Sequence, residues 1–469
     1  MRTDTIAAIA TAMTNSGIGI IRLSGSDSFE IIDKIYRSKK GTKKLSEVKS
    51  HTIHYGYICD GDKIIDEVMV LIMKAPNSYT TEDTVEIDCH GGTLVMKRIL
   101  ETVIKYGARP AEPGEFTKRA FLNGRIDLSQ AESVIDIINA KNDFALESSL
   151  HQLQGAVLSK IKEIRGKVIH EIAFIETALD DPEHISIEGY GEQLYTIMEN
   201  VSRDVDNLLR SSENGELLKE GIHTVIVGKP NAGKSSLMNA LVGKERAIVT
   251  DIAGTTRDVI EEQINLNGIT LNIVDTAGIR DTADVVERIG VDKAKEYLAK
   301  ADLIIYVVDS TVPLDENDDE IIEMIANRRI IILLNKTDLQ GAIQKEDIEK
   351  RFEQIKNPEM SVEKRNIISI SAKEGSGMEM LTETIKEMFF QGELSFNDEV
   401  YITNVRQKTS LQEALKSFQM VMGSIEAGMP EDFYSIDLMN AYEELGNIIG
   451  ESVGEDLVNE IFSKFCMGK

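Results

Sequence analysis

One glycine-bearing stretch, VIVGKPNAGKSSLMN at residues 225–239, constrains the fold of this chain more than any other. It has the pattern G-x-x-x-x-G-K-S, with an apolar run at residues 224–227 before it and a helical pattern at residues 235–241 after it. A phosphate chain needs backbone N–H groups that point into a tight loop at the positive end of a helix. The stretch therefore predicts a strand, a phosphate-binding loop and a helix, rather than a turn that binds nothing.

The pattern predicts a role for individual side chains of this loop. Lys234 would reach the outer phosphates of a nucleotide, and the hydroxyl of Ser235 would hold Mg2+. The further nucleotide contacts expected from this stretch are Asn231, Ala232, Gly233 and Ser236.

The base is indicated by Asn335-Lys336-Thr337-Asp338, which follows an apolar run at residues 330–334. Ligands of open α/β sheets bind at the carboxyl ends of the strands. A carboxylate there can accept two hydrogen bonds from the amino and imide N–H groups of guanine. Adenine offers no such pair, so Asp338 predicts GTP. Ser371-Ala372-Lys373, after the apolar run at residues 367–370, is expected to support the same ring from the other side.

Two further segments are expected to respond to the γ-phosphate. Asp275-Thr276-Ala277-Gly278 follows the apolar run at residues 269–274. Asp275 would hold Mg2+ through water, and the N–H of Gly278 would face the γ-phosphate. Thr255 and Thr256 both offer a hydroxyl to Mg2+, and Thr256 is the predicted ligand. The nucleotide contacts expected from this loop are Thr250, Asp251, Ile252, Ala253, Gly254, Thr255 and Thr256.

The hydrolytic group is not the usual one. Ile279 stands where Ras-like switches place a water-orienting glutamine. An apolar side chain cannot position the attacking water, so hydrolysis needs another polar group. Glu287 is the candidate catalytic residue, and a solvated glutamate at a helix start is the alternative. Arg257 and Arg280 lie nearby without an assignable role, and a monovalent cation could supply the same positive charge.

Composition restricts the class of protein. A chain of 469 residues is long enough for roughly three domains of about 150 residues. Its 52 basic and 79 acidic residues give a net charge of −27, which argues against a general nucleic-acid-binding surface. Any nucleic acid would meet a local patch or be presented by a partner. Cys59, Cys89 and Cys466 have neither disulfide nor zinc spacing, and no export signal or membrane-spanning run is visible, so a cytoplasmic protein is expected.

Patterns along the chain predict a multidomain fold. Residues 1–118 combine short apolar strands with helical segments and are expected to form an α+β domain. Residues 119–220 and 392–469 are expected to form one α-helical domain, in which an apolar stripe over residues 150–168 indicates a long helix. An α/β P-loop GTPase domain with a doubly wound parallel sheet, residues 221–391, would be inserted into it. Its strands are expected at residues 224–227, 269–274, 303–308, 330–334 and 367–370.

Several motifs outside the phosphate loop complete the pattern of the chain. They are Gly19-Ile20-Ile21-Arg22-Leu23-Ser24-Gly25, the run PGEFTKRAFLNG at residues 113–124, Ala253-Gly254-Thr255-Thr256-Arg257-Asp258 and the terminal Phe465-Cys466-Met467-Gly468-Lys469. Together with the four nucleotide-binding segments, these motifs resemble those of the MnmE, or TrmE, family of tRNA-modifying GTPases, and the resemblance covers the whole chain in the same domain order. Thr81 departs from the glycine that is usual at its place, and Arg125 departs from the common lysine but keeps the charge.

The resemblance implies a K+-activated GTP hydrolase that forms a homodimer through its amino-terminal domain, with Glu287 as the hydrolytic residue. With MnmG it would form a heterotetramer that installs an aminomethyl or carboxymethylaminomethyl group at C5 of the wobble uridine of certain tRNAs. FAD would be carried by that partner and not by this chain, and tRNA would bind mainly with the partner. The implied K+ ligands are Asn231, Thr250, Ile252 and Thr255. The implied site for a 5-formyltetrahydrofolate-type one-carbon donor is Arg22, Glu82, Arg125 and Lys469.

A second function from another class stays open. The same nucleotide motifs occur in regulatory GTPase switches of ribosome assembly, in which a helical domain would only recruit partners. Such a switch would need neither the amino-terminal domain nor the terminal Lys469.

Overall fold

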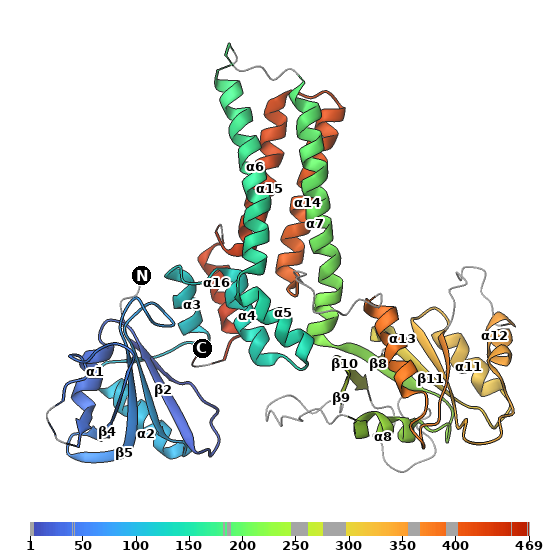
Figure 1. Ribbon diagram of the computed structural model, residues 1–469, viewed down its shortest axis with the longest axis horizontal. Coiled ribbons are helices and arrows are strands. Elements are labelled where there is room, and N and C mark those ends of the chain that lie inside the picture. The colour runs from blue at the N-terminus through green and yellow to red at the C-terminus, as the bar shows by residue number, and fades with distance from the viewer. Residues whose placement is uncertain are drawn as a thin grey trace. The chain divides into compact units, whose positions relative to one another are not determined.

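The computed structural model describes residues 4–39, 41, 43–181, 183–184, 189–244, 261–274, 297–354, 366–390, 402–451, 453–466 and 468 (Figure 1). Contacts group the chain into two units. The first comprises Met1–Asn139, Ser149–Asp206 and Thr409–Lys469, and the second comprises Ala140–Ser148 and Asn207–Lys408. The domain boundaries expected after residues 118, 220 and 391 stay predictions.

The amino-terminal part of the first unit is a seven-stranded sheet in the order β3-β4-β5-β6-β2-β1-β7. Its strands pair antiparallel, except that β1 pairs parallel with β7. Helices α1 and α2 pack on one face of this sheet and share a single buried core with it (Figure 1). The expected α+β fold is confirmed. The elements are β1 (Ile6–Ile9), β2 (Ile18–Ser24), α1 (Ser28–Ile35), β3 (Tyr36–Ser38), β4 (Thr52–Asp60), β5 (Lys63–Met73), β6 (Thr84–His90), α2 (Thr93–Lys105) and β7 (Arg109–Pro110).

Helices form the parts of the chain on either side of the nucleotide segments, as expected. The stripe over residues 150–168 does not form one helix, because α5 ends at Leu153 and α6 begins at Ala156. Gly155 lies between them with a φ of 93°, a left-handed conformation that ends a helix and that glycine adopts without steric cost. The elements are α3 (Glu115–Leu122), α4 (Leu128–Asn139), α5 (Asp143–Leu153), α6 (Ala156–Asp180), α7 (Tyr190–Glu220), α14 (Val405–Glu426), α15 (Glu431–Ile449) and α16 (Glu455–Ser463).

The second unit contains a six-stranded sheet in the order β13-β12-β11-β8-β10-β9. Neighbouring strands are parallel, except that β9 pairs antiparallel with β10 at one edge. The expected α/β fold is confirmed, and β9 is a strand that the sequence pattern did not predict. The elements are β8 (Ile222–Val227), α8 (Lys234–Lys244), β9 (Glu261–Leu266), β10 (Ile269–Val274), β11 (Leu303–Asp309), α11 (Glu316–Ile325), β12 (Ile330–Asn335), α12 (Lys345–Gln354), β13 (Asn366–Ser369) and α13 (Met378–Phe390).

Both faces of this second sheet are buried. One face packs against α8 and α13, and the other packs against α11 and α12. Strand β11 illustrates the result, because its residues from Leu303 to Val308 are buried in succession. Unbroken burial of this kind is typical of parallel strands that are covered on both faces. Polar groups are therefore expected to gather beyond the carboxyl ends of the strands, where ligands of such sheets bind.

Candidate functional site

Two glycines of the loop between β8 and α8 bring its backbone close to the neighbouring strands β11 and β12. Gly228 has a φ of 150°, and a Cβ atom on it would lie 2.3 Å from the carbonyl oxygen of Val307 in β11. Gly233 has a φ of 101°, and a Cβ atom there would lie 2.1 Å from Nδ2 of Asn335 at the end of β12. Both distances are far below van der Waals contact, so only glycine fits at these two places. The glycines of the motif thus let the loop pack against β11 and β12.

Lys234 folds its side chain back over this loop. Its Nζ donates to the carbonyl oxygen of Gly228 at 2.7 Å and to that of Lys229 at 2.9 Å. Burial lowers the pKa of the Lys234 ammonium. The lysine is thus held at the loop in a place that suits its expected contact with phosphates. Ser235 and Ser236 follow at exposed positions in the first turn of α8, where a hydroxyl is accessible to a metal ion.

Asn335 joins three segments of the site. Its Nδ2 donates to the carbonyl oxygen of Ala232 at 2.8 Å, and its Oδ1 accepts from the backbone N–H of Ala372 at 3.0 Å. The residue is only 2% exposed, so these bonds satisfy a buried amide. Lys336, which follows it with a φ of 67°, places its Nζ 2.5 Å from a carboxylate oxygen of Asp309. The structure therefore links the phosphate loop, the N-K-x-D segment and the S-A-K segment through one side chain.

Asp338 lies exposed beyond the end of β12, and its carboxylate is oriented by Ser371. The buried Ser371 hydroxyl donates to Oδ1 of Asp338 at 2.7 Å, and the backbone N–H of Thr337 donates to the carbonyl oxygen of Ile370 at 3.2 Å. The hydrogen bond from Ser371 is the main reason that the pKa of Asp338 is lowered, and the charge of Lys373 adds to it. An ionised, oriented carboxylate at this place suits the two N–H groups of guanine.

Several predicted site residues lie outside the described part of the chain. The structure says nothing about the predicted γ-phosphate and Mg2+ segments, the predicted catalytic residue or the terminal lysine. These residues are Thr250, Asp251, Ile252, Ala253, Gly254, Thr255, Thr256, Asp275, Thr276, Ala277, Gly278, Glu287 and Lys469.

Sequence reasoning missed a charged contact that supports the phosphate loop. Lys229 places its Nζ 2.6 Å from Oδ2 of Asp318 and 3.0 Å from Oδ2 of Asp315, both at the start of α11. Asp318 is 1% exposed and also accepts from the hydroxyl of Tyr306 at 2.7 Å. Asp315 and Asp318 form a capping box for α11, which is a local pattern that could have been recognised. Their contact with the loop could not, because it joins residues far apart in the chain.

In the amino-terminal domain, two of the predicted donor-site residues lie against one ring. The Cζ atom of Arg22 is 5.8 Å from the centroid of the Tyr79 ring, and that of Arg125 is 4.5 Å from it. Arg22 also donates through Nε to Glu86 at 2.7 Å and through Nη1 to the carbonyl oxygen of Gly468 at 3.0 Å. The structure therefore brings the carboxyl-terminal segment next to Arg22. Tyr79 carried no sequence signal that marked it.

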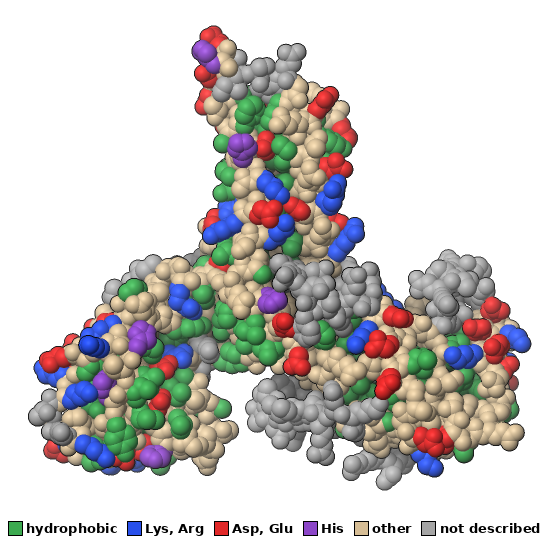
Figure 2. Space-filling model, in the orientation of Figure 1, with side chains coloured by type: hydrophobic (Ala, Val, Ile, Leu, Met, Phe, Trp, Pro, Cys, Tyr) green, Lys and Arg blue, Asp and Glu red, His purple; other side chains and the backbone are tan. Residues whose placement is uncertain are grey.

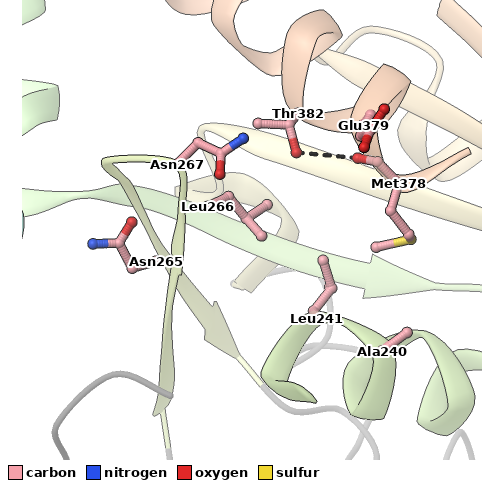
Figure 3. Close-up of a pocket in the computed structure, with 8 residues that line it drawn as sticks. All are labelled: Ala240, Leu241, Asn265, Leu266, Asn267, Met378, Glu379 and Thr382. Carbon is pink, nitrogen blue, oxygen red and sulfur yellow. Dashed lines mark hydrogen bonds between the residues drawn. The ribbon is translucent and has the colours of Figure 1, made fainter. Parts of the chain in front are cut away.

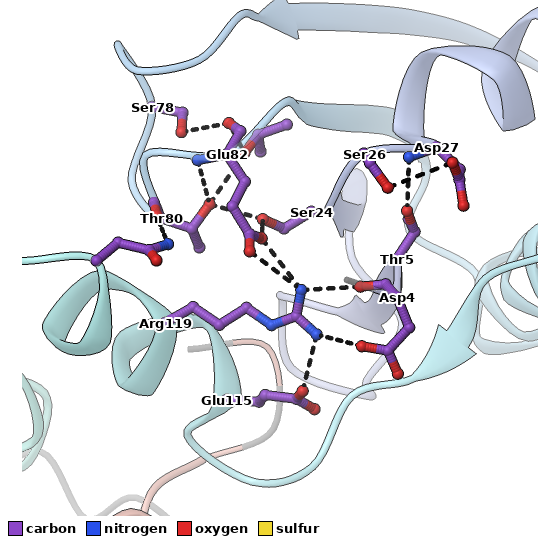
Figure 4. Close-up of polar contacts among 12 residues, drawn as sticks. Asp4, Thr5, Ser24, Ser26, Asp27, Ser78, Thr80, Glu82, Glu115 and Arg119 are labelled. Atoms are coloured by element: carbon purple, nitrogen blue, oxygen red, sulfur yellow. Dashed lines mark hydrogen bonds and ion pairs between the residues drawn. The ribbon is translucent and has the colours of Figure 1, made fainter. Parts of the chain in front are cut away.

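Glu82, the third described residue of that set, is held by internal partners (Figure 4). Nη1 of Arg119 lies 3.1 Å from its Oε2, to which the hydroxyl of Ser24 donates at 2.7 Å. The same guanidinium reaches Asp4 at 3.1 Å and Glu115 at 3.0 Å (Figure 4). Arg119 is 7% exposed, so an otherwise costly buried cation is paired with several carboxylates.

Thr81, directly before Glu82, has a φ of 62°. This left-handed conformation is rare for a β-branched residue and costs glycine nothing. The backbone of this turn thus gives a physical reason for the glycine that is usual there in the family that the sequence resembles.

A separate cavity of about 210 Å³ lies between α8, the β9–β10 turn and α13 (Figure 3). It contains no residue of the phosphate loop or of the N-K-x-D and S-A-K segments. Its lining residues are Ala240, Leu241, Asn265, Leu266, Asn267, Met378, Glu379 and Thr382.

Two kinds of feature are absent from the described residues. Among the described helices, none is long and apolar enough to cross a membrane. The same part of the chain contains no group of three or more His, Cys, Asp or Glu side chains that could hold a metal ion. The predicted Mg2+ and K+ sites are of another kind, because they depend on hydroxyl and amide oxygens and on the nucleotide itself.

Comparisons with known proteins cover the whole chain. The model of the MnmE helical domain matches residues 128–466, and the model described as GTP-binding protein TrmE N-terminus matches residues 5–125. The chain is 58% identical to the tRNA modification GTPase MnmE of Lachnoclostridium phytofermentans over 469 residues, 100% of both chains. It is 48% identical to the protein of the same name from Clostridioides difficile, over 99% of each chain. The solved G domain of the T. maritima FeoB iron transporter is 25% identical over 35% of this chain and 97% of that chain, with a TM-score of 0.25, which is too low for a conclusion.

Proposed function

The chain belongs to the MnmE family of tRNA modification GTPases, and we propose that its GTP hydrolysis supports formation of a 5-aminomethyl or 5-carboxymethylaminomethyl group on the wobble uridine of certain tRNAs. The observation that carries the proposal is the likeness over the full length of both chains. It includes the amino-terminal sheet and the helices, which GTP binding alone does not require. In this proposal the chain acts together with MnmG, which carries FAD.

GTP occupies the carboxyl ends of the sheet strands in this proposal. Asp338 and Ser371 select guanine, Asn335 holds the base-binding and phosphate-binding segments together, and Lys234 binds the outer phosphates. Mg2+ would be held by Ser235 and Thr256, and it would neutralise charge on the β- and γ-phosphates. The exposed Ser235 hydroxyl in the first turn of α8 fits that role.

A monovalent cation completes the site in our proposal. Asn231 has a φ of 62° and lies exposed in the phosphate loop, so its side-chain oxygen is accessible to an ion. The other proposed K+ ligands are Thr250, Ile252 and Thr255. The ion would add positive charge next to the phosphates, which is the contribution that an arginine makes in other GTPases.

Potassium is therefore expected to accelerate GTP turnover by at least about tenfold over sodium, because the stabilising charge depends on an ion of the right size. Turnover should be measured in KCl and in NaCl at equal ionic strength, with saturating Mg2+. Asn231→Ala is expected to reduce the difference between the two salts. Equal rates of the unaltered protein in the two salts would refute the potassium site.

The one-carbon donor would bind in the amino-terminal domain at Arg22, Glu82, Arg125 and Lys469. Two observations support this placement. The guanidinium groups of Arg22 and Arg125 lie against Tyr79, and Gly468 accepts a hydrogen bond from Arg22. Arginine side chains suit the carboxylates of a folate. The carboxylate of Glu82, fixed by Arg119 and Ser24, suits a ring with N–H donors.

A homodimer would use the sheet face that α1 and α2 leave uncovered. Ile53 and Tyr55 of β4 are 63% and 50% exposed, and Met69, the cross-strand partner of Tyr55 in β5, is 40% exposed. Hydrophobic side chains are visible on the surface of this domain in Figure 2. Neighbouring exposed apolar side chains are typical of protein interfaces, which supports the proposed dimer.

The proposal is tested by the C5-modified wobble uridine in tRNA from a strain whose only copy carries Lys469→Ala. We expect modification to fall to the level of a strain that lacks the chain, because a proposed donor ligand is removed. Lys464→Ala, an exposed lysine five positions earlier, is the matched control and should leave the level unchanged. Normal modification in the strain that lacks the chain would favour the regulatory switch.

A further inference from the structure

One short segment is basic although the chain as a whole is acidic. Residues 37–49 contain the basic residues Arg37, Lys39, Lys40, Lys43, Lys44 and Lys49 and the single acidic residue Glu47. The chain as a whole has a net charge of −27. The rest of the surface repels polyanions on average. A polyanion is therefore expected to bind where lysines are in local excess.

The segment is anchored to the domain. Oδ1 of Asp33 in α1 accepts from the backbone N–H groups of Leu45 at 2.6 Å and Ser46 at 3.3 Å. The side chain of Leu45 is 0% exposed and belongs to the core of the domain. The lysines around it are therefore displayed from a fixed backbone.

Hydrogen bonds connect this segment to the strands next to it. Nζ of Lys43 lies 2.7 Å from Nδ1 of His54, and Nε2 of His54 lies 2.8 Å from the hydroxyl of Thr52. That hydroxyl donates to the carbonyl oxygen of Lys49 at 2.6 Å. Burial, and then the charge of Lys43, lower the pKa of His54, so a neutral ring accepts from Lys43 and donates to Thr52.

A fourth lysine joins the same surface from the end of β5. Nζ of Lys74 donates to the carbonyl oxygen of Ser46 at 3.1 Å. Lys43, Lys44, Lys49 and Lys74 together are called the lysine patch below. His54 is buried and pairs across the strands with the core residue Val70, so the Lys43 ammonium contacts the face of the sheet that α1 and α2 cover.

The charges of the lysine patch are not compensated within the described residues. Arg37 and Lys39 have acidic partners, Asp62 at 3.1 Å and Glu67 at 3.6 Å. By contrast, the described part of the chain places no carboxylate within 4.0 Å of the four patch lysines, which have no salt bridge there. Lys34 of the same domain, for comparison, is paired with Glu30 at 2.6 Å.

We propose that the lysine patch binds the phosphate backbone of tRNA, an inference that rests on the function proposed above. Lysine ammonium groups suit repeated phosphates, and they carry no base specificity. Four such contacts predict weak binding with a slope of about −3 in log K against log salt, because each neutralised phosphate contributes about 0.7 to 0.9. The patch would orient tRNA on this chain, while the partner would supply most of the affinity.

The test compares two triple variants of the full chain. In K43Q/K44Q/K49Q the patch loses three charges, and we expect the Kd for tRNA to rise about tenfold or more at about 50 mM KCl. The salt slope between about 50 and 200 mM KCl should fall by about 2 to 3. The control, K34Q/K97Q/K105Q, removes three exposed lysines of the same domain that are each paired with a carboxylate. Its affinity and salt slope should stay close to those of the unaltered protein.

The proposal would be overturned by an unchanged slope in the patch variant, by equal losses in both variants, or by no measurable tRNA binding of the unaltered chain. Loss of binding to vesicles of anionic lipid with unchanged tRNA binding would assign the patch to a membrane surface and overturn it too. If the triple variant unfolds at lower temperature, the single Lys44→Gln variant should still reduce the slope by about 0.7 to 0.9. GTP turnover should be normal in every variant. Failure of the proposed function would appear instead as unchanged wobble-uridine modification in a strain that lacks the chain.

Discussion

An asparagine in place of Asp338 is expected to lower the affinity for GTP by about 100-fold or more. Two hydrogen bonds from guanine to an ionised carboxylate would be lost or weakened, and a hydrogen bond to a charged group contributes about 1.5 to 3 kcal/mol. The asparagine amide would also turn an N–H donor toward the amino group of guanine. The exposed carboxylate is already oriented by Ser371 in the described structure, so its loss should not be offset by rearrangement.

The same substitution should improve binding of xanthosine triphosphate. Xanthine has a carbonyl oxygen where guanine has an amino group, and it keeps the neighbouring N–H. Asparagine can donate to that oxygen and accept from that N–H, whereas aspartate can only accept. Equilibrium binding of GTP and of xanthosine triphosphate to the same variant measures both effects. Asp347→Asn changes the same charge at an exposed position in α12 and serves as the control. Equal losses for both nucleotides would mean that Asp338 supports the fold rather than the base.

Local sequence patterns were enough to predict most strands of the nucleotide unit, and the exceptions have physical causes. β10 begins and ends where its apolar run does, and β11 and β12 each extend one residue further. β9 was missed because its sequence, EEQINL, has polar residues at most positions. It is an antiparallel edge strand that pairs only with β10. Its sequence therefore lacks the continuous apolar run that is typical of a strand buried on both faces.

The break between α5 and α6 shows a second limit. Apolar residues continue at helical spacing on both sides of Gly155, so periodicity alone favours one helix. The break depends on the left-handed φ of a single glycine, and a glycine inside an apolar stripe does not reveal whether the backbone adopts that conformation.

The motifs identified residues of the nucleotide site but did not predict the contacts between them. The N-K-x-D pattern identified Asn335, but its bonds to Ala232 and Ala372 join segments that lie far apart in the chain. In the amino-terminal domain, no motif singled out Tyr79, and the run at residues 113–124 contains Arg119 but does not predict its contacts with Glu82 and Asp4. Motifs list residue types at fixed local spacing, so they carry no information on which distant segments the fold brings together.

Replacing Glu287 by alanine is expected to slow GTP hydrolysis by about 100-fold or more, with little change in GTP affinity. Ile279 removes the glutamine that orients water in Ras-like proteins, so another polar group must act on the attacking water. A group that acts only on that water makes its interaction in the transition state and not with bound GTP. Its loss should therefore lower kcat and kcat/KM equally and leave binding intact.

Single-turnover hydrolysis with saturating K+ and Mg2+, together with equilibrium binding of a non-hydrolysable GTP analogue, separates the two quantities. Glu320→Ala removes an exposed glutamate of α11 in the same unit and should change neither. A loss of analogue affinity in Glu287→Ala would make the residue structural. Unchanged hydrolysis would remove it from the mechanism and leave the cation and the phosphate-loop lysine as the groups that lower the barrier. Because potassium adds charge at the phosphates while Glu287 acts on water, Glu287→Ala should keep its preference for K+ over Na+ in whatever activity remains. Loss of that preference together with activity would show that the two contributions depend on one another.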